Sequence, residues 1–210
     1  MKILVFGASG DTGYNLLSQG VGKGHRITAY VRDPSKLKIE HKNLSIFKGD
    51  VSNAQQVEDA ICDQEAVISA LGAPSPFKRD FTLIRGIENI VSAMTMLNIR
   101  RFVYQSFLGV KEHREDLGFL LDRVIPVFLK NVIKDHEAKE QIITGSPLQW
   151  TIVRCPILTN GIITGKYMHG ETITSASPLP LISRADVADF ILNQLHDTKY
   201  INKKPRIMNR

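Results

Sequence analysis

Short runs of consecutive apolar residues alternate along the chain with segments whose apolar residues recur every three or four positions. The runs Ile3–Phe6 and Ala66–Ile68 are apolar at every position, as expected for strands that are covered on both faces. The longer periodic segments are typical of helices that pack one face on a sheet. This alternation predicts parallel strands joined by crossover helices, which is the α/β class.

The same pattern predicts where the elements lie. Six strands are expected at Lys2–Phe6, Arg26–Val31, Leu44–Lys48, Ala66–Ser69, Arg101–Gln105 and Gln149–Arg154. Helices are expected near Asp11–Gln19, Asn53–Ile61, Phe81–Leu97, Asp135–Thr144 and Arg184–Leu195. A short strand at Arg206–Met208 is expected to close the edge of the sheet. The expected fold is a Rossmann-type, doubly wound, mainly parallel sheet with helices on both faces.

Length and composition favour one domain. A chain of 210 residues with 43% hydrophobic residues can bury a sizeable core without a disulfide or metal. We expect a single domain over residues 1–210, in which residues from about 155 to 210 form a small C-terminal extension. No stretch approaches the ~20 apolar residues that span a bilayer, and Cys62 and Cys155 match no metal-ligand spacing. These features predict a cytoplasmic protein with no membrane segment and no metal site.

The net charge of +6 has two interpretations that stay open, attraction for an anionic ligand or a solvated basic surface. Basic residues are scattered, with short clusters only at Arg100-Arg101 and Lys203-Lys204. A nucleic-acid-binding protein usually carries a basic stripe, so we expect no nucleic-acid partner. The pattern is compatible with a monomer or a homodimer.

The segment Gly7–Gly13 follows the first predicted strand directly and opens the first predicted helix. Glycine at Gly7 permits a tight turn, and glycine at Gly10 lets the backbone approach a pyrophosphate. Gly13 allows the helix to pack closely on the sheet. Glycines also serve ordinary turns, but a strand before and a helix after this segment favour a phosphate loop of a dinucleotide-binding site.

Further motifs follow the other strands in chain order. They are Val31-Arg32-Asp33, Gly49-Asp50-Val51, Ala70-Leu71-Gly72, Gln105-Ser106-Phe107 and Trp150-Thr151-Ile152-Val153-Arg154. With the Gly-x-x-Gly-x-x-Gly spacing, they resemble the atypical short-chain dehydrogenases/reductases, in particular the NAD(P)H-binding group that contains biliverdin-IXβ reductase/flavin reductase and NmrA-like proteins. The resemblance covers nearly the whole chain. It implies a Rossmann domain that binds NAD(P)H, with the C-terminal extension on the substrate side.

The tip of the second strand bears on the choice between NADPH and NADH. An acid there would accept from the ribose 2′-OH, whereas arginine would hold a 2′-phosphate through its planar fork. The chain has Arg32 followed by Asp33, and Asp33-Pro34-Ser35 also has the pattern of a helix N-cap. The resemblance places an NADPH-binding arginine at Arg32, with Lys36 nearby, so NADPH is expected over NADH.

The resemblance assigns the adenine contacts to Asp50 and Val51 and the nicotinamide ribose contacts to Leu71 and Gly72. A plain turn at Gly49-Asp50 is compatible with the first role. The predicted cofactor-binding residues are Gly7, Ser9, Gly10, Asp11, Thr12, Gly13, Arg32, Lys36, Asp50, Val51, Leu71 and Gly72.

The chain lacks the usual catalytic pair of short-chain dehydrogenases, Tyr-x-x-x-Lys, at the expected place. Its one formal match, Tyr200–Lys204, lies near the C-terminus, and Asp135–Lys139 after the fifth strand contains no tyrosine. Carbonyl–alcohol interconversion by that route is therefore not expected. Hydride transfer to a flavin or another conjugated acceptor demands less of the protein, which chiefly stacks the acceptor on the nicotinamide.

The resemblance implies that Ser106 and His136 are catalytic. Ser106 has an alternative role in capping the strand tip, and His136 could be an exposed residue at a helix start. The related proteins carry a second histidine after Pro156, where this chain has isoleucine, which weakens the case for bile-pigment reduction. Phe107, Phe119 and Pro156 are predicted substrate contacts, and residues 109–133 could form either a lid or a packed helix.

Two functions follow from these expectations. The first is an NADPH-dependent reductase of a flavin or a similar conjugated small acceptor. The second is a non-catalytic redox sensor of the NmrA type, which binds the dinucleotide without turnover. The NmrA-like regulators are usually longer, so this chain of 210 residues favours the enzyme.

Overall fold

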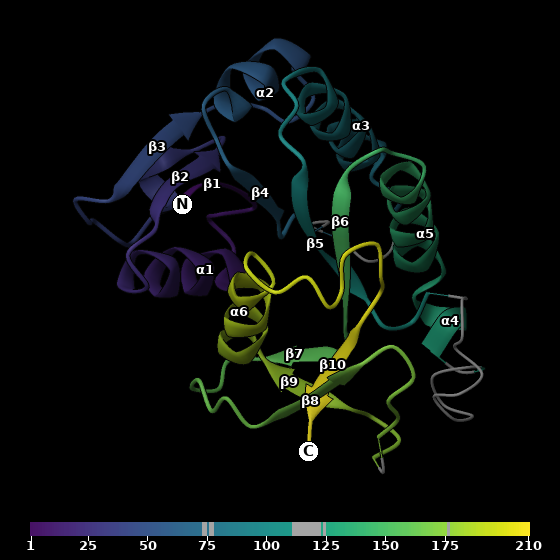
Figure 1. Ribbon diagram of the computed structural model, residues 1–210. Helices are drawn as coiled ribbons and strands as arrows, with labels where there is room; N and C mark the ends of the chain where they lie inside the picture. The colour runs from purple at the N-terminus through teal and green to yellow at the C-terminus, as the bar shows by residue number, and fades with distance from the viewer. Residues whose placement is uncertain (73–74, 76–77, 111–122, 124, 176) are drawn as a thin grey trace.

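The computed structural model describes residues 1–72, 75, 78–110, 123, 125–175 and 177–210 (Figure 1). Its N-terminal part runs through β1 (Lys2–Phe6), α1 (Asp11–Gly22), β2 (Arg26–Val31), a short 3-10 helix η1 (Pro34–Lys36), β3 (Leu44–Lys48), α2 (Ala54–Ile61), β4 (Ala66–Ser69), α3 (Phe81–Met96) and β5 (Arg101–Phe107). The remainder runs through α4 (Ile125–Phe128), α5 (Lys130–Thr144), β6 (Gln149–Cys155), β7 (Ile157–Thr159), β8 (Tyr167–Gly170), β9 (Leu181–Ser183), α6 (Arg184–Asn193) and β10 (Arg206–Asn209).

Within the described residues, the main sheet has the strand order β3-β2-β1-β4-β5-β6-β10-β8. Each neighbouring pair is parallel except β10 and β8, which are antiparallel. The chain order reverses between β1 and β4, and in such sheets a crevice opens at that switch point. A second sheet pairs β7 with β9. The predicted Rossmann-type, doubly wound fold is confirmed.

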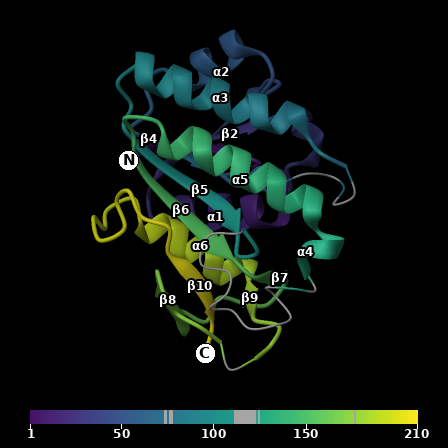
Figure 2. The ribbon, with the colours of Figure 1, turned by 90° about the vertical axis from the view of Figure 1, so that its right-hand side faces the viewer.

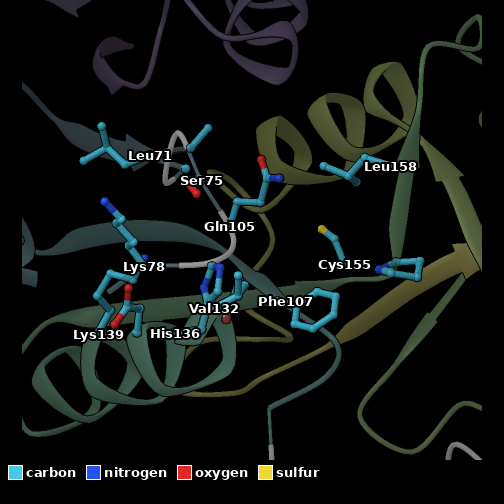
Figure 3. A pocket seen from close by; sticks show the side chains of 15 residues that line it. Leu71, Ser75, Lys78, Gln105, Phe107, Val132, His136, Lys139, Cys155 and Leu158 are labelled. Carbon is cyan, nitrogen blue, oxygen red and sulfur yellow. Dashed lines mark hydrogen bonds between the residues drawn. The ribbon is translucent and has the colours of Figure 1, made fainter. Parts of the chain in front are cut away.

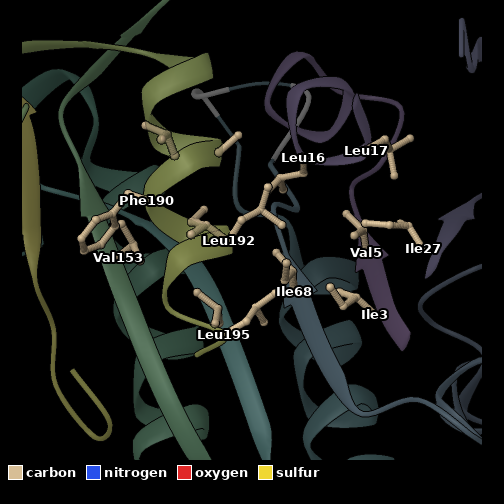
Figure 4. Close-up of a cluster of buried hydrophobic side chains, with 14 of the residues drawn as sticks. Ile3, Val5, Leu16, Leu17, Ile27, Ile68, Val153, Phe190, Leu192 and Leu195 are labelled. Atoms are coloured by element: carbon tan, nitrogen blue, oxygen red, sulfur yellow. The ribbon is translucent and has the colours of Figure 1, made fainter. Parts of the chain in front are cut away.

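Helices cover both faces of the main sheet. Figures 1 and 2 show α2, α3 and α5 side by side over one face, while α1 and α6 lie together on the other. Successive residues of a strand point to opposite faces, so Ile3 and Val5 pack with α1 and α6 (Figure 4), whereas Leu4 and Phe6 pack toward α2 and α3. The uninterrupted apolar run in β1 is needed because both of its faces are buried.

The structure corrects some predicted bounds. Helix α5 begins at Lys130 rather than near Asp135, so His136 lies in the second turn of the helix and not at its start. Its N-cap residue, Leu129, makes no side-chain cap, so the sequence carries no N-terminal signal there. Strands β5 and β6 continue beyond their predicted ends to Phe107 and Cys155.

Strand β10 does not close the sheet edge, because the unpredicted strand β8 pairs antiparallel on its outer side. Strand β8 has four residues, and so short a run beside glycines carries a weak strand pattern. No helix within the described ranges is long and apolar enough to cross a membrane.

Candidate dinucleotide cleft and active site

The loop between β1 and α1 is built on close backbone approaches. Gly7 has a φ of +78°, and a Cβ there would lie 2.5 Å from the carbonyl oxygen of Ala70, so the loop passes directly over the end of β4. A Cβ at Gly13 would collide with the backbone of Gly7 and Ala8. Gly13 therefore brings α1 against the loop itself, rather than against the sheet as expected.

Gly10 is the N-cap of α1, and its position has no side-chain cap. The first N–H groups of a helix have no partner within the helix, so those of α1 are available to an anion. A Cβ at Gly10 would meet only the carbonyl oxygen of Gly7, at 3.4 Å. Open space in front of free N–H donors, at the positive end of the helix dipole, fits a pyrophosphate.

A cleft of about 590 Å³ runs along the carboxyl ends of the strands from β3 to β5. Every residue predicted to bind the dinucleotide lines it. The cleft is also lined by residues outside that predicted set, namely Tyr30, Val31, Ala70, Asp80, Thr82, Leu83, Gln105, Leu158 and Arg184. Its extent beyond the phosphate loop at both ends fits an extended ligand such as a dinucleotide.

The tip of β2 presents cations to this cleft. Arg32 is exposed and lines the cleft together with Lys36. Asp33 turns to η1 instead, where its carboxylate accepts from the Ser35 N–H at 3.1 Å and the Ser35 hydroxyl at 2.7 Å. The interpretation of Asp33 as an N-cap is confirmed. The end of β2 therefore faces the cleft with positive charge.

Asp50 serves the turn after β3 and lines the cleft as well. Its Oδ1 accepts from the N–H and the hydroxyl of Ser52, at 2.9 and 2.7 Å. These hydrogen bonds hold the pKa of Asp50 below its usual range, and Arg32 lowers it further. Asp50 is thus an ionised carboxylate at physiological pH. It stabilises the turn after β3 and also lines the cleft.

Arg184 also lines the cleft and adds a positive charge to it. No motif in the sequence indicates this position. It begins α6, and its Nε lies 3.7 Å from an oxygen of Asp11 in the phosphate loop. Its guanidinium also donates to the Asn160 side chain at 2.6 Å. Since a pyrophosphate would be repelled by the nearby Asp11 carboxylate, Arg184 offsets that charge.

A second pocket, of about 260 Å³, adjoins the cleft. The two share the tip of β4, Gln105 and Leu158. Figure 3 shows Phe107, Cys155 and Leu158 at one end of this pocket and Lys78 and Lys139 at the other. A molecule in the second pocket would therefore lie next to whatever occupies the β4 end of the cleft.

A buried hydrogen-bond network supports the floor of this pocket. Ser106 Oγ donates to Glu140 Oε1 at 2.6 Å, and Arg154 Nη2 donates to Glu140 Oε2 at 2.7 Å. His136 Nδ1 lies 3.0 Å from Tyr104 Oη and 3.3 Å from Ser106 Oγ. Ser106, Glu140 and Arg154 are each at most 4% exposed. Strands β5 and β6 and helix α5 thus hold Ser106 and His136 in fixed positions.

These bonds assign the proton of the His136 ring. Tyr104 is fully buried, and among the described residues His136 Nδ1 is the one partner of its hydroxyl. The hydroxyl therefore donates to Nδ1, and the neutral ring carries its proton on Nε2. Burial lowers the pKa of His136 well below its usual range, and Lys139 lowers it further. Since His136 lines the pocket, it offers a neutral donor there.

Lys139 is 2% exposed and lines the same pocket. Its natural partner one helical turn earlier, Asp135, is already engaged by Arg79 Nε at 2.8 Å and by the Asp80 N–H at 2.7 Å. Burial lowers the pKa of Lys139 to about 8, although Asp135 and Asp80 oppose this. The lysine amine faces the ring of Tyr104, with Nζ 6.0 Å from its centroid.

Gln105 carries a second unsatisfied group at the junction of the two cavities. Its Oε1 is buried and has no hydrogen-bond partner among the described residues. Gln105 lines both the cleft and the pocket. An unpaired buried acceptor is costly unless a ligand satisfies it, so this amide fits a ligand with an N–H group at the junction.

The predicted substrate contacts divide into two groups. Phe107 and Pro156 line the smaller pocket together with Ser106 and His136. Phe119 lies outside the described residues, as does most of the segment proposed as a lid or packed helix. Lys139, Gln105 and Arg184 also line these cavities, but they are not among the site residues predicted from the sequence.

Comparison with known proteins agrees with this geometry. A family model described as NAD(P)H-binding matches residues 7–198. The chain belongs to this NAD(P)H-binding family. The predicted kinship with NAD(P)H-binding Rossmann proteins is thereby confirmed.

Two solved structures share the fold of this family member. The anaerobillin reductase ChuY from Escherichia coli O157:H7 has a TM-score of 0.83 at 18% identity, covering 100% of this chain and 97% of that one. A wide-type short-chain dehydrogenase/reductase from Veillonella parvula, in complex with NADP, has a TM-score of 0.76 at 21% identity, covering 98% and 93%.

Curated relatives include a 3-beta-hydroxysteroid dehydrogenase from Mycolicibacterium neoaurum, 29% identical over 177 residues. The match covers 77% of this chain and 47% of that enzyme. The chain spans about half the length, or less, of the curated steroid dehydrogenases that it matches.

Proposed function

We propose that this protein is an NADPH-dependent oxidoreductase that reduces a flavin or a similar conjugated small acceptor by direct hydride transfer. The observation that carries the proposal is the junction of two cavities. The candidate dinucleotide cleft shares the tip of β4, Gln105 and Leu158 with a pocket of about 260 Å³. A donor in the cleft and an acceptor in the pocket would meet there, which is what hydride transfer requires.

In this proposal the phosphate loop holds the pyrophosphate, and Arg32 and Lys36 hold the 2′-phosphate of NADPH. Asp50 and Val51 border the adenine, while Leu71 and Gly72 border the nicotinamide ribose. The Gln105 amide oxygen, which has no partner within the described residues, would accept a hydrogen bond from the carboxamide of a bound nicotinamide.

The nicotinamide supplies the hydride when the cofactor is bound. The chain's own residues orient the acceptor. Phe107 and Pro156 contact its ring, and His136 Nε2–H donates a hydrogen bond to an oxygen or nitrogen on it. Ser106 Oγ accepts a hydrogen bond from the acceptor molecule, since the proton of its own hydroxyl is directed at Glu140. The proton that completes the reduction comes from water, because His136 is neutral.

The C-terminal part of the chain contributes to the acceptor side. Cys155, Pro156 and Leu158 line the pocket and mark the point where the chain leaves β6 for the second sheet. We therefore propose residues from about 155 to 210 as a substrate-side extension of a single domain.

Steady-state NADPH oxidation with FMN, riboflavin, quinones and biliverdins tests the function. The proposal expects at least one acceptor to be reduced well above the rate without protein. If every acceptor gives the background rate while NADPH binds, the protein is a dinucleotide sensor of the NmrA type instead.

NADPH is expected to bind at least tenfold tighter than NADH, a difference of about 1.4 kcal/mol, because Arg32 faces the cleft beside Lys36. Arg32→Ala should remove most of this preference and leave NADH affinity nearly unchanged. Calorimetric titration with both cofactors measures it. Arg26→Ala removes the same charge from the opposite end of β2 and should change neither affinity. Equal affinities of the wild type would contradict the assignment.

Ser106→Ala is expected to slow turnover roughly 10–100-fold, as for one lost hydrogen bond of about 1.4–2.8 kcal/mol in the transition state. His136→Ala should cost less, because water can take the place of its N–H. Stopped-flow rates at saturating NADPH measure both, with thermal unfolding as a check on the Ser106–Glu140 network. A loss of four or more orders of magnitude at His136 would mean obligatory general-acid catalysis.

A further inference from the structure

Lys139 is a buried cation that the Asp135 and Asp80 carboxylates attract without forming an ion pair with it. It is 2% exposed, yet in the described part of the chain its ammonium makes no hydrogen bond or ion pair. Both oxygens of Asp135 are occupied, one by Arg79 and the other by the backbone N–H of Asp80. A buried ammonium without a partner costs folding free energy. An anion bound in the pocket would give this ammonium a partner.

The pocket is also polarised from end to end. Lys139 and Lys78 lie at one end, and Phe107, Cys155 and Leu158 form an apolar wall at the other, with His136 between them (Figure 3). The Asp135 carboxylate also lines the pocket, but Arg79 and the Asp80 N–H engage its two oxygens. Lys78 is exposed and so belongs to the rim, while Lys139 lies at the bottom. A ligand that fits both ends has an apolar, planar body and one anionic group.

We infer that the acceptor is a conjugated, planar molecule bearing an anionic group such as a carboxylate, and that Lys139 binds this group. The inference rests on the proposed function, because it names the class of acceptor for that same pocket. The ring lies against Phe107 and Leu158 beside the β4 junction, while the anionic group points to α5. Lys78 adds a second, solvated charge at the rim. Uncharged acceptors of the same shape leave Lys139 unpaired and bind less well.

Direct binding of a matched pair of probes tests this without requiring turnover. We choose 2-naphthoate and 2-naphthamide, which share the ring system and differ in charge. Calorimetric titration of the protein saturated with NADP⁺ should give at least tenfold tighter binding of the carboxylate. Lys139→Met should bring the two affinities within about twofold of each other, and Lys139→Arg should keep the preference. Lys134→Met, an exposed lysine on the same helix, should leave the preference as in the wild type.

Equal binding of the two probes by the wild type would overturn the inference, and so would a preference that survives in Lys139→Met. A third contrary result is a loss of NADP⁺ affinity in Lys139→Met with the carboxylate preference unchanged, because the lysine would then serve the cofactor. These outcomes are separate from the test of the proposed function. That proposal fails if no acceptor is reduced, whereas the carboxylate preference is measured by binding alone.

Discussion

Gly10→Val is expected to lower the affinity for NADPH at least 100-fold, or about 2.8 kcal/mol, while the protein stays folded. The backbone at Gly10 has a φ of −82° and a ψ of 167°, which valine adopts readily. The added side chain would meet little of the protein, since the nearest atom to a Cβ is the Gly7 oxygen at 3.4 Å. It would instead fill the space in front of the free N–H groups of α1.

Calorimetry measures the loss of affinity, and circular dichroism shows whether the variant folds. Gly22→Val is a matched control, because Gly22 lies at the other end of α1 and a Cβ there meets nothing within 4 Å. It should bind NADPH as the wild type does. A folded Gly10→Val protein with wild-type affinity would show that the phosphates bind elsewhere.

Lys139→Met is expected to raise the free energy of unfolding at pH 7 by about 3 kcal/mol. Burial lowers the pKa of Lys139 from 10.5 to about 8, and each factor of ten in proton affinity corresponds to about 1.4 kcal/mol. Methionine is an unbranched side chain of similar size that carries no charge. The lysine therefore costs stability in the free protein, as expected for a residue kept for binding.

The buried charge of Lys139 should also make the free energy of unfolding depend on pH. Between pH 8 and pH 10.5 the unfolded chain holds the Lys139 proton and the folded protein does not, so the stability of the wild type rises with pH in this window. Below pH 8 both states are protonated and the full cost remains. Urea unfolding at a series of pH values should show a rise in the wild type that is absent in Lys139→Met. Equal stability of the two proteins at pH 7 would contradict the burial of an unpaired charge.

The sequence predicted the parts of this site that lie within single strand-loop-helix units. The phosphate-loop glycines and the Asp33 cap depend on neighbours within a few residues, so local spacing predicts them, whereas the role proposed for Arg32 is implied by the family resemblance. The apolar runs likewise predict the central strands, because both faces of each strand are covered.

The parts that were missed are assembled from distant segments. Lys139 lies in the segment Asp135–Lys139, which contains no tyrosine, and the tyrosine that faces it, Tyr104, comes from β5. Arg184 reaches the phosphate loop because α6 packs beside α1, and no spacing in the sequence signals that contact. Whether such a residue can bind a ligand depends on how deeply it is buried and on whether its neighbours are already hydrogen-bonded. Both are determined by the folded structure and not by local sequence.

The most direct test of the whole account is the rate of acceptor-dependent NADPH oxidation by Val132→Trp. Val132 lines the smaller pocket and not the dinucleotide cleft, so tryptophan there should fill the acceptor site and spare the cofactor site. With an acceptor that the wild type reduces, we predict a rate at least 100-fold lower at unchanged NADPH affinity. Lys134→Trp, on the exposed side of the same helix, should react as the wild type does. A Val132→Trp protein that oxidises NADPH at the wild-type rate would contradict the account, because the acceptor would then be reduced outside this pocket.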